Sequence, residues 1–510
     1  MTPFSAILIL FLSFCTFTAP PAAAAEPDRH PLSMPQNQES GGVSEESQRP
    51  YRQVTGLIDT RTTYSDGVYD MTSLARLARE RGFDVLFIND HDRMVMEYGI
   101  PPFRNIFKKK VERNSINRKG AENFLAAVNK AAERYSDMIL IPGSESVPFY
   151  YWKGSPLLKN LTAHDHEKRL LTIGMEKPED YQSLPVIHNG FSNKYLNRFL
   201  PRTLVFFGAF ILCLFLLKGK GLYRTCGIIL SAVCLLAMVD AQPFRSSPFS
   251  QYDGNQGIAP YQLLIDYVNL KDGFTFWNYP ETRSGVRKLG PVFLNTAPYP
   301  EVLAQSRNYT GFAAVYGDTI TATEPGNQWD RVLLEYCRGE RKRPVWGIAT
   351  ADFHEDGGAG QMLGDFPTVF LVRRKTKADI LFALKTGRMY ASRTNYPQQI
   401  LLKDFSVSAG LSGDKATLGE EIVLNSHPKI HIFLAFKEPV EQPVSVRLIR
   451  SGKLIETFTG KLPMEIDYED RFSRPGEKIY YRMDMTGHGI LVSNPIFVKF
   501  SQQKQSGSGS

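Results

Sequence analysis

Carboxylate and imidazole side chains recur in this sequence where apolar, strand-like stretches end. They are Asp59, Arg61 and Asp66 in LIDTRTTYSDG, with a guanidinium between the two acids; Asp90, His91 and Asp92 in FINDHD; Glu145 in LIPGSES; His164, Asp165 and His166 in LTAHDHEK; Tyr279 in FWNYPE; and Asp352 and His354 in GIATADFHEDG. Carboxylate oxygens mixed with imidazole nitrogens suit Zn, Mn or Fe. The pattern therefore predicts a site for divalent metal ions.

Alternating strand and helix patterns surround these side chains. Residues 70–82 and 121–135 have apolar residues at helical spacing, and the first of these helices is expected to end at Gly82. Residues 83–90 and 137–146 are apolar and predict buried strands. Strand–helix–strand alternation indicates a parallel α/β architecture, and parallel barrels build active sites at the carboxyl ends of their strands. The polar side chains are therefore expected to meet at the end of the barrel where the parallel strands terminate, here called the mouth.

The same alternation resumes in the second half of the chain. Helices are predicted at 259–269, 328–339 and 377–388, and strands at 273–281, 310–317 and 344–357. From Pro397 onward the strand-like stretches become short, with alternating apolar and polar residues. Ser451-Gly452 predicts a hairpin turn between two of them. This change of pattern predicts a C-terminal all-β sandwich over 397–502.

Two apolar segments separate the halves. Residues 203–217 and 225–239 carry no charge and are joined by the basic stretch KGKGLYR. Flanking apolar residues extend each segment toward the roughly 20 residues that a membrane span needs, and a basic link is typical of a cytoplasmic loop. We expect a transmembrane hairpin over 199–240; two buried helices of a soluble core are the alternative.

The N-terminus has an apolar run followed by small residues up to Ala25, which predicts a secretory signal peptide over 1–25. An uncleaved membrane anchor is the alternative. Residues 26–50 are polar and predict a flexible linker, and 503–510 a flexible tail. The net charge of +8 is spread without a long basic run, so no specific duplex nucleic-acid binding is expected.

The order of TTYSDG, NDHD, PGSE, TAHD and ADFH resembles that of the PHP (polymerase and histidinol phosphatase) domain family. The resemblance covers about residues 52–395, apart from the hairpin. It implies a distorted (β/α)7 TIM-like barrel formed from 51–198 and 241–396, with up to three metal ions and phosphoester hydrolysis as its activity.

The resemblance also implies metal ligands, residue by residue. Asp66, His91 and His354 match one ion; Glu145 and Asp352 match a second, with Asp59 as a replacement ligand; Glu145 and His164 match a third, with His166 as the alternative to His164. The sequence departs from the family where Asp59 and Arg61 replace a His-x-His pair and where Tyr279 replaces a histidine before proline. Fewer ions than the full cluster are therefore expected.

Arg61 is the most informative departure. A guanidinium offers only donors and cannot bind a metal ion, but it can hold two phosphate oxygens. Arg61 is therefore expected either to replace metal charge and contact substrate or to mark a site without metal; a salt bridge to Asp59 is a further alternative. Asp66 is expected to be catalytic, and Arg388 to be a second phosphate contact.

These expectations combine into two hypotheses. One is a metal-dependent phosphoesterase of the cell envelope, acting on phosphomonoesters, nucleotides or oligonucleotide ends. The other is a degenerate barrel that serves as a binding or scaffold module, with the β-sandwich contacting a protein partner. His91 precedes the hairpin and His354 follows it, so one shared site requires an even number of crossings. With the signal peptide, this predicts a bacterial inner-membrane protein whose folded parts are periplasmic.

Overall fold

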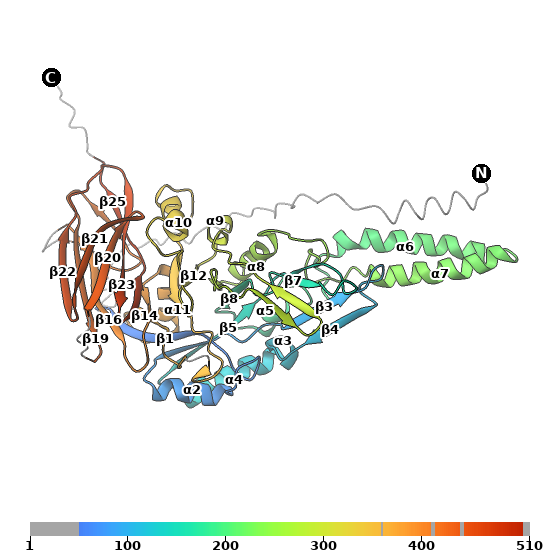
Figure 1. Ribbon diagram of the computed structural model, residues 1–510, viewed down its shortest axis with the longest axis horizontal. Helices are drawn as coiled ribbons and strands as arrows, with labels where there is room; N and C mark the ends of the chain where they lie inside the picture. The colour runs from blue at the N-terminus through green and yellow to red at the C-terminus, as the bar shows by residue number, and fades with distance from the viewer. Residues whose placement is uncertain (1–49, 359–360, 410–413, 439–442, 503–510) are drawn as a thin grey trace, which may run out of the picture. The chain divides into compact units, whose positions relative to one another are not determined.

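A computed structural model describes residues 50–358, 361–409, 414–438 and 443–502 (Figure 1). The predicted signal peptide, the linker up to residue 49 and the tail lie outside the described residues.

Seven strands form a curled sheet around the predicted site. In spatial order they are β1 (Arg52–Thr60), β2 (Val85–Ile88), β5 (Ile139–Ser146), β8 (Arg169–Ile173), β9 (Phe274–Asn278), β12 (Gly311–Val315) and β13 (Trp346–Ala349). Beyond β13, the backbone N–H groups of Ala351 and Phe353 donate to the carbonyls of Ile58 and Asp59 in β1. The curl of the sheet thus brings its last strand back beside its first.

One strand departs from the expected parallel arrangement. β1, β2 and β5 are parallel, as are β9, β12 and β13, but β8 runs antiparallel to both β5 and β9. Between β5 and β8 the chain makes the short strands β6 (Tyr151–Lys153) and β7 (Thr162–His164), with no helical crossover. A parallel neighbour requires a crossover, usually a helix, so β8 re-enters the sheet in the opposite direction.

The five longer helices outside the hairpin agree with the sequence patterns. They are α2 (Met71–Glu80), α4 (Ala121–Arg134), α8 (Ala259–Asn269), α10 (Gln328–Cys337) and α11 (Lys377–Thr386). In α2, Asp70 caps the N-terminus by accepting from the Ser73 N–H, and Gly82 follows the helix with φ +80°. That left-handed conformation favours glycine and explains why the helix ends there. Short helices are α3 (Ile116–Lys119), α5 (Pro178–Gln182) and α9 (Val302–Gln305).

The C-terminal β-rich part shares its main sheet with the α/β part. β14 (Pro367–Val372) pairs antiparallel with β1, β15 (Met389–Arg393) pairs with β14, and β24 (Gly489–Ser493) pairs with β15. The sheet continues through β23 (Lys478–Gly487), β20 (Pro443–Arg450) and β21 (Lys453–Lys461); β25 (Ile496–Phe500) also pairs with β23, and β18 (Glu421–Leu424) pairs with β25. Ser451 and Gly452, both with positive φ, form the expected turn between β20 and β21.

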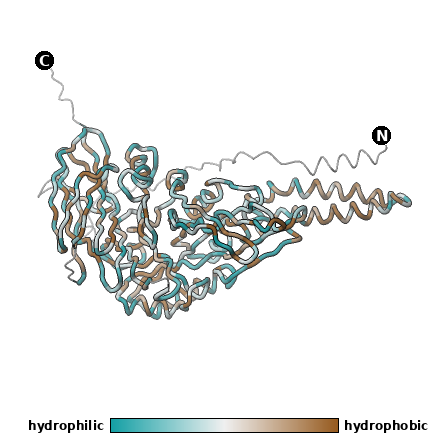
Figure 2. The backbone as a smooth tube through the Cα atoms, in the orientation of Figure 1, coloured by the Kyte–Doolittle hydropathy of each residue, from teal (hydrophilic) through white to brown (hydrophobic). Residues whose placement is uncertain are grey.

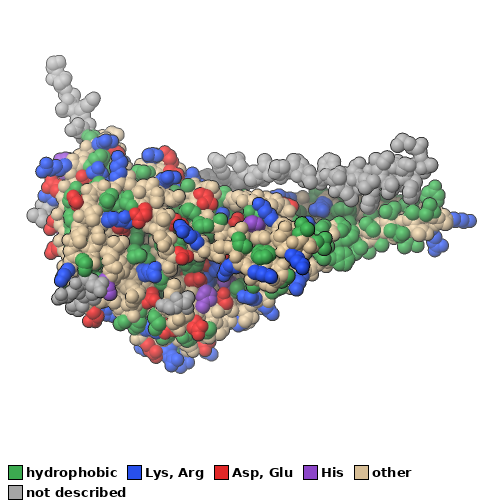
Figure 3. Space-filling model, in the orientation of Figure 1, with side chains coloured by type: hydrophobic (Ala, Val, Ile, Leu, Met, Phe, Trp, Pro, Cys, Tyr) green, Lys and Arg blue, Asp and Glu red, His purple; other side chains and the backbone are tan. Residues whose placement is uncertain are grey.

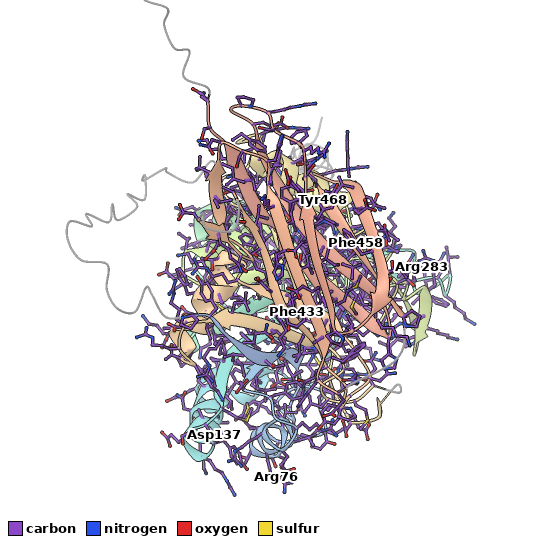
Figure 4. All side chains as sticks on the ribbon, turned by 90° about the vertical axis from the view of Figure 1, so that its left-hand side faces the viewer. Arg76, Asp137, Arg283, Phe433, Phe458 and Tyr468 are labelled. Carbon is purple, nitrogen blue, oxygen red and sulfur yellow. The ribbon has the colours of Figure 1, made fainter. Side chains whose placement is uncertain are left out.

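A second sheet packs against this extension. It contains β17 (Lys415–Ala416), β16 (Ile400–Ser408), β19 (Lys429–Phe436) and β22 (Met464–Glu469). Figure 4 views the β-rich part, with Phe433 of β19 and Tyr468 of β22 labelled in this sheet and Phe458 of β21 in the other. Buried aliphatic side chains such as Ile432 and Val446 form a core distinct from that of the α/β part.

The apolar segments form α6 (Leu196–Leu216) and α7 (Leu222–Asp240), two helices that lie side by side (Figure 1). By length and composition both could cross a membrane, and only a small part of each is buried. Leu212, for example, is 70% exposed, and Figure 2 shows hydrophobic residues along both helices. Helices in the core of a soluble protein would be mostly buried, so this exposure disfavours that alternative.

Candidate active site

Three predicted metal ligands meet at the carboxyl ends of the strands. Asp66 follows β1, His91 follows β2 and His354 follows β13. The Asp66 Oδ2 atom lies 3.4 Å from His91 Nε2 and 3.3 Å from His354 Nε2. The curl of the sheet is what brings these residues together, since His354 lies far from the other two in sequence.

Asp90 holds the loop that carries Asp66. Its Oδ1 atom accepts from the Thr62 N–H at 2.8 Å, the Ser65 N–H at 3.0 Å and the Ser65 hydroxyl at 2.6 Å, while Oδ2 accepts from the Thr62 hydroxyl at 2.6 Å. Asp90 is fully buried, so it does not reach the mouth itself. It acts by fixing the turn that aims Asp66 at the two imidazoles.

Replacing Asp90 by alanine should therefore weaken metal binding without removing a ligand. Removing a group that orients a metal ligand typically costs about 10–100-fold in metal affinity. Calorimetric titration of the protein with Zn²⁺ or Mn²⁺ would measure this loss. Asp137→Ala is the matched control, because Asp137 is exposed and pairs with exposed Arg79 away from the site. Equal affinities in the two variants would contradict this role for Asp90.

Arg61 lies at the centre of the remaining acidic groups. Its Nη2 atom lies 3.0 Å from Asp59, 2.7 Å from Glu145 and 3.3 Å from Asp352, and Nη1 donates to the Asn89 carbonyl. The Arg61 side chain has no exposed surface. The guanidinium thus occupies the space between carboxylates that the resemblance assigns to a second ion, and the expected Asp59–Arg61 ion pair is part of this arrangement.

Two further polar residues, Arg169 and Asn278, complete the network, and sequence reasoning missed both. The Arg169 Nη1 atom lies 2.7 Å from Glu145 Oε2, and the Asn278 amide donates to Glu145 Oε1 at 2.7 Å and to Asp59 Oδ2 at 2.8 Å. Arg169 begins β8, directly opposite Asn278 in β9. The start of an antiparallel strand lies at the same edge of the sheet as the ends of parallel strands, which is why residues at the ends of parallel strands are not the whole site.

The backbone is strained at three positions in this network. Asp59, Tyr279 and Asp352 have φ values of +70°, +47° and +47°. Such conformations are uncommon for residues other than glycine and cluster at functional sites. Tyr279, which replaces an expected histidine, donates its hydroxyl hydrogen to Asp59 Oδ2.

Burial and neighbouring charges set the protonation of the network. Burial raises the pKa of Asp59, opposed by Arg61 and reinforced by Glu145. Burial also opposes ionisation of Glu145, but Arg169 and Arg61 outweigh it and lower the Glu145 pKa. Likewise, the neighbouring imidazoles of His354 and His91 overcome burial and hold the pKa of Asp66 well below its usual range. Glu145 and Asp66 are therefore the acids held as carboxylates.

The Asp66, His91 and His354 group fits a divalent ion on three counts. His91 Nε2 is buried and makes no hydrogen bond to any described residue. His354 Nδ1 lies 2.6 Å from the Asp352 carbonyl; a carbonyl only accepts, so Nδ1 carries hydrogen and Nε2 is left to face Asp66. Two ligands about 2.0–2.1 Å from one tetrahedral ion are about 3.4 Å apart, and each imidazole lies at about this distance from Asp66. The two imidazoles lie farther from each other, because the ligand atoms of these three described residues do not all come within 4.8 Å of one another, so binding one ion requires the rings to move closer together.

The three ligand atoms nevertheless do not form a compact group, because Asp66 lies between the two imidazoles. In the described ranges, three ligand atoms all come within 4.8 Å of one another only at His431, Glu465 and Asp467. That second group lies on β19 and β22 and is largely exposed, far in sequence from the site. Exposed acidic groups of this kind are common without a metal ion, so we assign no ion to it.

The structure does not bring two predicted residues to the network. His164 stacks on Tyr151 at 5.1 Å in β7, and Arg388 pairs with Glu420 at 3.2 Å beside Tyr51. His166, the alternative to His164, is nearer: burial lowers its pKa to about 3, with Arg169 and His91 contributing. Of the two histidines, His166 is thus the one within electrostatic reach of the cluster.

Comparison with known proteins gives only distant similarities. No family profile matches the sequence, and no curated protein matches it. A two-domain protein containing a predicted PHP-like metal-dependent phosphoesterase, from Bacteroides vulgatus, is 9% identical with a TM-score of 0.33, covering 85% of this chain and 90% of that one. A protein described as a metal-dependent phosphoesterase, from Bifidobacterium adolescentis, is 16% identical with a TM-score of 0.30, covering 64% and 96%.

A third solved structure, an amidohydrolase from Chromobacterium violaceum with bound sulfate and no metal, is 12% identical with a TM-score of 0.27, covering 59% and 88%. Because the identities and TM-scores are this low, we derive neither family nor activity from them.

Proposed function

We propose that this chain is a metal-dependent phosphoesterase with a distorted (β/α)7 PHP barrel, held at a membrane by α6 and α7. The observation that carries the proposal is the convergence of His91 and His354 on one oxygen of Asp66, at 3.4 and 3.3 Å. Carboxylate with two imidazoles is a donor set for Zn, Mn or Fe. The substrate would be a small phosphorylated compound.

The metal ligands and Arg61 have different roles in this proposal. A divalent cation held by Asp66, His91 and His354 would supply Lewis-acid polarisation of a phosphoryl oxygen. Arg61 adds a fixed positive charge that needs no metal, because Asp59, Glu145 and Asp352 surround it. Since Arg61 has no exposed surface, it acts on phosphate through its charge and not by the direct contact expected from sequence.

In this proposal Arg169, and not Arg61, contacts the phosphate of the substrate directly. It shares Glu145 with Arg61, and its side chain keeps 20% of its surface exposed. A guanidinium so placed can donate to a phosphoryl oxygen and stabilise the charge that develops there. Arg388, paired with Glu420, has no part in this arrangement.

The decisive experiment measures metal content and phosphatase activity of the purified full-length chain and of His91→Ala. We expect about one Zn, Mn or Fe ion per chain, lost in the variant, and hydrolysis of p-nitrophenyl phosphate esters reduced about 100-fold or more. His427→Ala is the control, because His427 is exposed in the β-sandwich. Wild-type protein that binds no metal and hydrolyses neither monoester nor diester would overturn the proposal.

One observation favours a second candidate, a non-catalytic binding or scaffold module. Glu145, which would serve two ions in a full cluster, already accepts from Arg61, Arg169 and Asn278. A carboxylate so fully engaged is a poor metal ligand. If the remaining three ligands hold no ion in the experiment above, this candidate replaces the enzyme.

The proposed location is a bacterial inner membrane, with the folded parts periplasmic. His91 precedes the hairpin and His354 follows it, and both contact Asp66. Two crossings return the chain to the side it left, which is what a single site built from both halves requires. The choice of the periplasmic side depends on the N-terminal apolar segment, which lies outside the described residues.

A further inference from the structure

The root of the α6–α7 hairpin joins the protein at the same end of the sheet as the candidate active site. Just before the hairpin, the Ile187 N–H donates to the Pro148 carbonyl at 3.2 Å; just after it, the Gln251 carbonyl accepts from the Trp152 N–H at 2.9 Å. Pro148 closely follows β5, whose carboxyl end carries Glu145, and Trp152 lies in β6, the next strand. The two membrane-directed helices therefore leave from the mouth side of the sheet.

A β-ribbon makes a second link between the site and the hairpin. β3 (Val95–Gly99) and β4 (Lys108–Glu112) form this ribbon directly after His91. At its turn, the Asn105 N–H and side-chain amide donate to Asp240 Oδ1 and to the Asp240 carbonyl, both at 2.7 Å. Asp240 ends α7. The ribbon that starts at a metal ligand is thus fixed to the end of a membrane helix.

The segments at this end expose large apolar side chains. Five of them, with their exposed fractions, are Ile100 (60%), Phe107 (52%), Leu157 (92%), Leu158 (74%) and Phe191 (85%). They come from the β3–β4 ribbon, the β6–β7 loop and the segment before α6. Exposed apolar clusters mark protein or membrane contact sites, and their continuity with the two membrane helices favours the membrane.

Basic side chains accompany this apolar surface. Lys108, Lys109 and Lys110 are exposed successive residues of β4. Lys108 and Lys110 share one face and pair with Glu97 at 2.9 Å and Glu112 at 2.8 Å, and Lys109 lies on the other face. Figure 3 shows Lys and Arg side chains near the base of the hairpin. Lysines next to aromatic and aliphatic side chains are typical of surfaces that meet anionic lipid headgroups. We call the ribbon, the β6–β7 loop and the segment before α6 the collar.

The candidate ligands are themselves reachable from outside. Asp66, His354 and Asp352 keep 32%, 34% and 43% of their side chains exposed. A phosphate group at a bilayer surface under the collar would therefore meet accessible ligand atoms, whereas Arg61 and Glu145 remain buried behind them.

We propose that the substrate is a phosphoester carried by a membrane lipid, with its phosphate presented at the bilayer surface under the collar. This inference rests on the proposed function. In the reaction, a bond forms between the oxygen of water and phosphorus, the bond from phosphorus to the lipid alcohol oxygen breaks, and the proton from water passes to that alcohol oxygen. A soluble phosphoester is the competing substrate class.

The test compares lipid and soluble substrates with the same reacting group. Full-length protein in phosphatidylcholine vesicles is supplied with phosphatidic acid or glycerol phosphate, and with phosphatidylglycerol or glycerophosphoglycerol, at equal bulk concentration. In at least one pair the lipid should react about tenfold faster or more, because a membrane-bound enzyme meets a locally concentrated substrate. Lys108→Glu/Lys109→Glu/Lys110→Glu should reduce that lipid-to-soluble ratio about fivefold or more.

A binding measurement in His91→Ala protein does not depend on turnover. Hydrogen exchange of the β4 amides should slow when phosphatidic acid is added to phosphatidylcholine nanodiscs, and the triple lysine variant should lose this effect. Soluble esters hydrolysed as fast as the lipids, together with unchanged exchange, would overturn the lipid inference and leave the phosphoesterase standing. No hydrolysis in either pair and no bound metal would overturn both.

Discussion

Replacing Arg61 by methionine is expected to lower the free energy of unfolding by about 3–5 kcal/mol, the typical cost of removing one partner of a buried ion pair. Arg61, Asp59 and Glu145 are all fully buried, so the variant leaves Asp59 without its cation and Glu145 with Arg169 as its remaining cationic partner, away from water. Methionine keeps much of the side-chain volume, which limits the contribution of a cavity. Urea unfolding of the metal-free, detergent-solubilised protein measures the loss.

The same variant tests whether Arg61 stands in for a metal ion. With the guanidinium gone, Asp59, Glu145 and Asp352 would surround a space suited to a divalent cation, so Mn²⁺ or Zn²⁺ should recover part of the lost stability. Arg79→Met is the matched control: its pair with Asp137 is half exposed and should contribute only about 0.2–1 kcal/mol. If Arg61→Met lost no more stability than Arg79→Met, the charge-replacement role would be wrong.

The second large effect is expected at the junction of the α/β part and the β-sandwich. Asp330 in α10 and Arg482 in β23 form a doubly bonded ion pair, both contacts 2.7 Å, with no exposed side-chain surface. The Tyr480 hydroxyl also donates to Asp330 at 2.7 Å. Asp330→Asn keeps the shape but leaves the buried Arg482 charge with only the longer contact to Asp484 at 3.8 Å among its described acidic neighbours, which should cost about 3–5 kcal/mol.

Urea unfolding followed by limited proteolysis would check this prediction, because the weakened junction should expose cleavage sites between β15 and β16 before the rest of the chain. Glu477→Gln provides the comparison, since Glu477 and Arg474 pair at 3.7 Å on the surface. A loss in Asp330→Asn no greater than that in Glu477→Gln would show that the ion pair does not hold the two parts together.

Several site residues were predictable because local pattern determines them. Asp66, His91, Glu145, Asp352 and His354 each follow or end an apolar stretch, and the carboxyl ends of parallel strands share one edge of a sheet. Their gathering therefore required only the correct strand pattern. The hairpin was predictable for a similar reason, since uninterrupted apolar runs have no polar face to place in water.

The residues that sequence reasoning missed depend on strand direction. Arg169 reaches Glu145 because β8 runs antiparallel, which turns the start of a strand into a site position. The direction of a strand depends on which backbone groups pair across the sheet. The sequence of a short strand does not indicate whether it will pair parallel or antiparallel. Asn278 is missed for a related reason: only the register of β9 against β8 shows that its amide faces Asp59 and Glu145.

The sequence by itself determined the kinds of side chain at the mouth, their order along the chain, and the presence of two exposed apolar helices. Those features follow from residue chemistry and short-range periodicity. Only the tertiary structure decided that Arg61 is enclosed by three acids, that Arg169 reaches Glu145 from β8, and that the segments flanking the hairpin bond to the chain that follows β5. These features depend on contacts between segments that are distant in sequence. Burial and backbone pairing determine those contacts, and local sequence patterns do not indicate them.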